Sequence, residues 1–136
     1  MRKREEGTAA IELVLVAPVL VVLLAAIIGA GRVVNTKSAV LTVAREAARA
    51  AAEAPDASAA KEAAQRRADE VASGLGLDPG RLTLVEEPGA FGRGEPYSVD
   101  VSYRVELGDL PAMGFLPGSF VVSARHTELT ERYKSR

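Results

Sequence analysis

The chain has 136 residues, no cysteine and a formal net charge of −1 at pH 7, with 17 basic and 18 acidic side chains. This balance excludes the basic face that nucleic-acid binding requires, so no nucleic-acid partner is expected. Without cysteine, neither a disulfide framework nor a thiolate metal site is possible. The length allows one modest domain once a membrane segment is subtracted.

The first feature along the chain is an uncharged apolar run, Leu13–Gly31. As a helix it would extend about 28 Å, close to the hydrocarbon thickness of a bilayer and longer than the core of most secretory signals. We therefore predict a transmembrane helix over residues 8–31. Basic residues at positions 2–4 precede it, which makes residues 1–7 a cytoplasmic leader and residues 32–136 an exported domain. The predicted location is a cell membrane that the chain crosses once.

Three residues inside the apolar run have their own predicted roles. Pro18 is expected to kink the span, because proline removes one bond of the helical ladder. Ala25 and Gly29 form a small-xxx-small pair, which would let a second helix approach closely. This pattern is common in membrane spans and is weak evidence when taken alone.

Helix-forming sequence continues beyond the apolar run, and we predict a helix over about 32–53 that prolongs the span. Small apolar residues repeat there at helical spacing and define one face. The members of that face are Val33, Val40, Ala44, Ala47 and Ala51. Pro55 ends this helix, and Asp56 is a plausible N-cap for a second helix over about 56–73. Gly74 and Gly76 then end the second helix.

The sequence alternates between apolar and polar residues after position 81, which predicts strands over about 81–87, 97–107 and 119–129. In the second strand, Tyr97 and every second residue to Val105 share one face. The predicted fold class is α+β and pilin-like: a long N-terminal transmembrane and amphipathic helix, a second helix and a small three-stranded antiparallel sheet. One of the two helices, or both, must cover the apolar face of the sheet.

Glu12 is a carboxylate at the entrance to the apolar run, five residues after Gly7. Insertion scales put an acid at the centre of a membrane helix at about 2.5–3.5 kcal/mol, with a smaller penalty near the interface. One interpretation places Glu12 at headgroup depth, facing water. The other is that a cation relieves the penalty.

The segment EEGTAAIELVLVAPVLVVLLAAIIGAGRVV resembles the start of TadE-like proteins, the pilin-like components of tight-adherence (Flp-type) pilus systems. The matching features are a short basic leader, Gly7 followed by a small residue, Glu12, and Pro18 inside the span. The resemblance extends over residues 1–52. Major Flp-type pilins are much shorter and usually carry an aromatic residue where this chain has Leu13. The resemblance therefore favours a minor pilin over the main filament subunit.

This resemblance implies processing by a prepilin peptidase, which would cut between Gly7 and Thr8 and make Thr8 the new N-terminus. It further implies that Glu12 pairs with the free amine of a neighbouring pilin-like subunit. Such a pair would specify the register between subunits more than it would stabilise them.

The sequence shows no arrangement of residues that would support catalysis, and we predict neither enzymatic activity nor a cofactor nor a metal. His126 is the single histidine and is interpreted as a surface residue of a strand. The serines have no recognisable base beside them in sequence.

The predicted function is a TadE-like minor pilin or pilus-assembly protein, acting with the pilus machinery in biogenesis, adhesion or secretion. The surface pilus is its second expected location, besides the cell membrane. The alternative is an uncleaved single-pass anchored domain whose sheet and GFLPG loop bind an envelope partner. An exported hydrolase with a signal anchor is a third interpretation, for which no catalytic residues are found.

Overall fold

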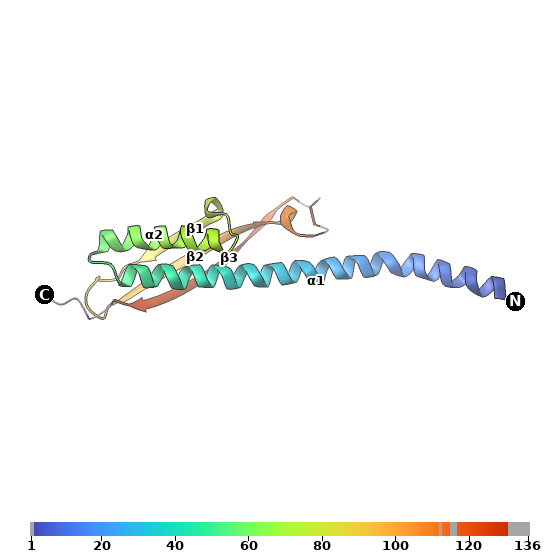
Figure 1. Cartoon of the computed structure of the whole chain (residues 1–136), viewed down its shortest axis with the longest axis horizontal. Helices are drawn as coiled ribbons and strands as arrows, with labels where there is room; N and C mark the ends of the chain where they lie inside the picture. The colour runs from blue at the N-terminus through green and yellow to red at the C-terminus, as the bar shows by residue number, and fades with distance from the viewer. Residues whose placement is uncertain (1, 112, 115–116, 131–136) are drawn as a thin grey trace. The chain divides into compact units, whose positions relative to one another are not determined.

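The computed structural model describes residues 2–111, 113, 114 and 117–130. Within these residues the helices are α1 (Arg2–Ala52) and α2 (Ala57–Gly74), and the strands are β1 (Leu82–Glu87), β2 (Pro96–Glu106) and β3 (Ser119–Leu129) (Figure 1). Short 3-10 helices, η1 (Pro79–Arg81) and η2 (Leu107–Asp109), precede β1 and follow β2. The chain divides into two compact units: Met1–Val33 with Glu106–Gly118, and Val34–Val105 with Ser119–Arg136.

The second unit is an antiparallel sheet with helices on one face. The strand order is β1-β2-β3, and the register pairs Leu82 with Tyr103 and Glu87 with Ser98. Burial alternates along β2 because successive side chains point to opposite faces. The predicted α+β fold class, with a long apolar N-terminal helix, a second helix and a three-stranded antiparallel sheet, is confirmed.

Both helices contribute to the core on the inner face of the sheet. The sequence left open which helix covers this face, and the structure uses the second half of α1 together with α2. Four of the five residues of the predicted helical face are buried, whereas Val33 belongs to the other unit and is half-buried. The core includes Val40, Val43, Ala44, Ala47, Ala48 and Ala51 of α1, the inner residues of β2, and Val122 and Ala124 of β3.

Helix α2 packs through a stripe made only of alanines. Asp56 accepts a hydrogen bond from the backbone of Ala59 at 2.9 Å and is the N-cap, as expected. Gly76 has a positive φ of 75°, and the Leu77 amide bonds to the carbonyl of Ala72 at 2.8 Å, which ends the helix. The stripe consists of Ala60, Ala64, Ala68 and Ala72, which are fully buried. Such small side chains pack well only when the helix backbone lies close to its neighbours.

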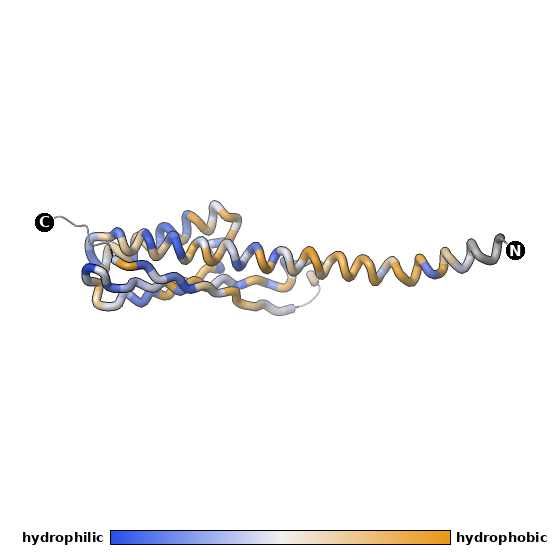
Figure 2. The backbone as a smooth tube through the Cα atoms, turned by 90° about the horizontal axis from the view of Figure 1, so that it is seen from below, coloured by the Kyte–Doolittle hydropathy of each residue, from blue (hydrophilic) through white to orange (hydrophobic). Residues whose placement is uncertain are grey.

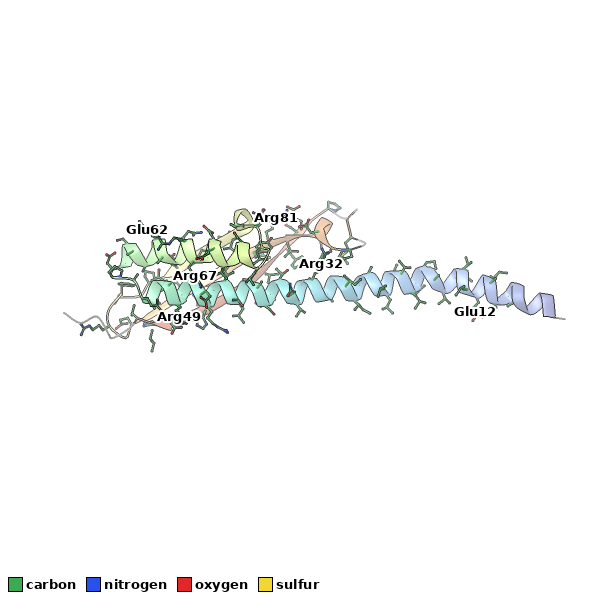
Figure 3. All side chains as sticks on the ribbon, in the orientation of Figure 1. Glu12, Arg32, Arg49, Glu62, Arg67 and Arg81 are labelled. Atoms are coloured by element: carbon green, nitrogen blue, oxygen red, sulfur yellow. The ribbon has the colours of Figure 1, made fainter. Side chains whose placement is uncertain are left out.

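Polar contacts made by α1 and α2 also stabilise the second unit. Lys37 of α1 donates a hydrogen bond from Nζ to the carbonyl of Ser123 in the edge strand β3. Arg67 of α2 bonds to Glu46 of α1 at 3.0 Å (Figure 3 labels Arg67). These contacts hold helix to strand and helix to helix.

The first unit contains the apolar part of α1, which is coloured mostly orange in Figure 2. The large apolar side chains of this part are exposed. This helix is long and apolar enough to cross a membrane, with a mean hydropathy of 3.0 over its most apolar window. The helix begins at Arg2 and runs through the predicted leader, because arginine, lysine and glutamate are good helix formers and Gly7 costs only about 1 kcal/mol. The other part of this unit is the segment that connects β2 to β3.

Candidate functional site

The candidate site residues predicted from the sequence all lie on α1. Gly7 is inside the helix, and a Cβ atom added to it would meet nothing within 4 Å. The backbone there is helical, so neither conformation nor packing requires glycine at this position. Alanine would stabilise the helix by about 1 kcal/mol more. The fold of the single chain therefore does not account for glycine at this position.

Glu12 projects from the surface of α1 between two exposed apolar residues (Figure 3). Ile11 is 65% exposed and Leu13 is 68% exposed. Within the described part of the chain, Glu12 has no ion-pair partner. A carboxylate beside such side chains is disfavoured in lipid unless a cation or a hydrogen-bond donor reaches it.

Thr8 precedes Glu12 by four residues, so the two positions share one face of α1 and are separated by about 6 Å along the helix axis. The carboxylate and a new amine at Thr8 would thus lie one helical turn apart in the same subunit. An amine on a neighbouring helix can meet Glu12 when the two helices are shifted by that turn.

The other predicted residues lie further along the same helix. α1 continues through Pro18, where the carbonyl of Val14 loses its usual amide partner. The predicted kink at Pro18 stays a prediction. Ala25 is half-buried and Gly29 is buried, and a Cβ atom added to Gly29 would meet nothing within 4 Å. The chain itself therefore leaves room beside Gly29.

The polar clusters of the sheet unit have structural roles. Arg125 lies on the outer face of the sheet and bridges Asp100 at 2.8 Å and Glu87 at 2.6 Å, which ties the three strands together. The hydrogen bond to Asp100 is the largest cause of the raised pKa of Arg125. Among the described residues, no group of three or more histidine, cysteine, aspartate or glutamate side chains could hold a metal ion.

Two partly buried groups on the inner face were not found by sequence reasoning. His126 lies on the same side of β3 as Val122 and Ala124, and its Nε2 atom is 3.2 Å from Oε2 of Glu128. The sequence predicted a surface residue, whereas the structure shows that His126 is partly buried. Glu86 follows Leu84 on the inner face of β1, where burial raises its pKa. Burial and the nearby Glu86 carboxylate raise the pKa of Tyr97 to about 12. Strand alternation places His126 and Glu86 inward, because each lies an even number of residues from an inner-face position, Ala124 and Leu84 respectively.

The apolar, exposed part of α1 fits a single-pass membrane anchor. The family model described as TadE-like protein matches residues 7–49. This match covers about a third of the chain and confirms, over that segment, the resemblance seen in the sequence. The matched segment begins at Gly7 and includes Thr8, Glu12, Pro18, Ala25 and Gly29. Neither the curated proteins nor the solved structures yielded a match.

Proposed function

We propose that the chain is a TadE-like minor pilin or pilus-assembly protein that a prepilin peptidase processes and that acts in Flp/Tad pilus biogenesis, adhesion or secretion. One observation carries the proposal. The family match starts at a helical glycine that the fold does not require, and an exposed carboxylate without a described ion-pair partner follows five residues later on an apolar helix.

The processing step is hydrolysis of the Gly7–Thr8 peptide bond. Water adds across that bond, so residues 1–7 leave with a carboxylate on Gly7, and Thr8 gains a free α-amine. The pKa of an α-amine is about 7.7–8.0, so the new N-terminus is mostly an ammonium at neutral pH. Cleavage therefore creates a cation at the cytoplasmic end of the span, where no basic side chain follows before Arg32.

The ammonium of one subunit meets Glu12 of the next in the proposed assembly. This contact pairs the Glu12 carboxylate with the Thr8 ammonium, so neither charge lies alone near lipid. Any other axial displacement between the two helices leaves both charges unpaired. The pair therefore selects a stagger in which the neighbouring helix is displaced by about one turn, or 6 Å. The same stagger brings Ala26 of one subunit level with Ala30 of its neighbour on the face that carries Thr8 and Glu12, so that two small residues face each other.

Orientation follows from the basic residues ahead of the span, which keep the N-terminus in the cytoplasm and leave the sheet unit on the exported side. The peptidase then meets Gly7 at the cytoplasmic face. The sheet unit lies outside, where pilus subunits assemble.

The test is a Gly7→Leu variant in the native host, with Gly31→Leu as the matched control. Both glycines are helical, and a Cβ atom added to either would meet nothing within 4 Å. We expect Gly7→Leu to accumulate as uncut precursor on an immunoblot, whereas Gly31→Leu is processed. N-terminal sequencing of the wild-type protein from membranes and from sheared surface fibres should begin at Thr8.

A wild-type protein at full precursor mass beside an active peptidase would overturn the processing proposal. That result would favour the uncleaved anchored domain instead. Its proposed binding loop includes Phe115 and Leu116, which lie outside the described residues, whereas Met113 is exposed.

A further inference from the structure

The connection between β2 and β3 belongs to the same compact unit as the apolar part of α1. Its base is closed by a hydrogen bond from the Leu107 amide to the Gly118 carbonyl at 2.9 Å. Two further backbone bonds, from Leu110 to Leu107 at 3.0 Å and from Met113 to Leu110 at 3.1 Å, form successive turns. We use the name η2 turn for residues 107–111, 113 and 114.

Arg32 attaches the η2 turn to the end of the apolar run. Its Nη1 atom donates a hydrogen bond to the carbonyl of Asp109 at 2.9 Å (Figure 3 labels Arg32). Arg32 is the first charged residue after Leu13–Gly31, so it marks the level at which α1 leaves the hydrocarbon. Under the single-pass arrangement of the proposed function, Arg32 would hold the turn at the depth of the lipid headgroups on the side opposite the leader.

The composition of the η2 turn suits that depth. Asp109 is its single charged residue, and the other side chains are Leu107, Leu110, Pro111 and Met113. Leu110 is 8% exposed, whereas Met113 is 36% exposed. Apolar side chains next to a cationic arginine are typical of segments that enter the boundary between headgroups and acyl chains.

We propose that the η2 turn is a second membrane contact, which inserts Met113 into the interface of the bilayer that α1 spans. Arg32 is a positioning residue, because it holds the turn against the helix at the membrane surface. The occupant of this apolar surface is lipid, since the turn is attached to the span at its exit. The inference rests on the single-pass arrangement of the proposed function.

The absence of native cysteine allows a single probe to test this contact in the full-length chain. A Met113→Cys variant carries an environment-sensitive fluorophore and is reconstituted into vesicles of phosphatidylethanolamine and phosphatidylglycerol. Gly114→Cys is a second position, because a Cβ atom there meets only the Gly108 carbonyl at 3.6 Å, an ordinary contact. Leu129→Cys is the matched control, because Leu129 is 62% exposed and ends β3 in the other unit.

We expect nitroxide lipids labelled near the headgroup to lower the emission of the Met113 and Gly114 probes about twofold or more, since interfacial groups lie about 5–10 Å into the boundary. Aqueous iodide should quench the Leu129 probe more strongly than either. An Arg32→Gln variant should reduce lipid quenching at Met113 and leave Leu129 unchanged.

Two results would overturn the inference. Iodide quenching of both turn probes, equal to that of the Leu129 probe, would place the turn in water. Shielding from iodide and from nitroxide lipids alike would show that protein covers it. Extraction by alkaline carbonate separates the two proposals: release of the chain refutes the single-pass arrangement, whereas an integral chain with water-exposed probes refutes only the lipid contact.

Discussion

A stagger of one helical turn between neighbouring subunits is the most specific consequence of pairing Glu12 with the Thr8 amine of the next subunit. Four residues separate the two positions, which displaces the neighbouring helix by about 6 Å. Two cysteine variants, Ala26→Cys and Ala30→Cys, report this displacement when they are co-expressed with different tags. Ala26 and Ala30 follow Thr8 and Glu12 by about five full helical turns, so all four lie on one face of α1, and both alanines are exposed.

The expected distances follow from helix geometry. Helix axes about 8–10 Å apart, with Cα atoms on a radius of about 2.3 Å, bring facing Cα atoms to about 3–5 Å. Ala26 of one subunit and Ala30 of the next face each other at one level, within the reach of a disulfide. Two Ala26 residues are offset by the stagger and lie about 7–8 Å apart, at or beyond the limit for a disulfide.

The assay is oxidation of native membranes followed by immunoblotting for both tags. We expect the mixed dimer to dominate over dimers of Ala26→Cys with itself. Adding Glu12→Gln to both variants should abolish this preference, because the neutral side chain no longer selects one stagger. Equal yields of the mixed and the same-residue dimers, or a preference that survives Glu12→Gln, would refute the reasoning.

Three further outcomes are expected. In the native host, Glu12→Gln should abolish the surface appendage while leaving cleavage at Gly7 intact, and appendages of normal number on sheared-fibre blots would contradict the pairing. Val101→Ala should lower the free energy of unfolding of the full chain in detergent by about 2–3 kcal/mol, because Val101 is fully buried in the central strand. Val121→Ala on the exposed outer face should change it by less than about 0.5 kcal/mol, and equal losses would contradict the core assignment. Burial raises the pKa of Tyr97 to about 12, whereas the pKa of tyrosine in the unfolded chain is about 10. The neutral Tyr97 side chain therefore contributes its full stability below about pH 10, and about 3 kcal/mol of it is lost as the pH rises toward 12. Denaturant titrations between these pH values should show a flatter loss for Tyr97→Phe, and parallel curves for the two proteins would contradict this assignment.

Residue patterns predicted the α+β fold well, because the spacing of apolar residues on one face identified each helix or strand and its buried side. The alternation from Tyr97 to Val105 specified both the central strand and its buried side, and Asp56 marked the start of α2. The alanine spacing in α1 identified the buried face but not its full width, since Val43 and Ala48 also enter the core.

Tertiary contacts decided what local patterns left open. His126 was interpreted as a surface residue, but β3 lies at the edge of a sheet whose inner face meets α1, so an inward position there is only partly covered. Phe91 has a positive φ of 42°, and its ring packs edge-on against that of Tyr97 with the two ring centroids 6.0 Å apart. The composition of the loop did not predict this arrangement. The attachment of Asp109 to Arg32 joins residues that are 77 positions apart, and no local signal predicts it.

The bond from Lys37 to the Ser123 carbonyl has a consequence for storage in a membrane. Many copies confined to one bilayer meet side by side far more often than copies free in solution, and an open strand edge invites a neighbour to extend the sheet. A charged side chain fixed on that edge opposes such addition. Subunits stored in the membrane can thus stay monomeric until they assemble through their helices rather than through strand pairing.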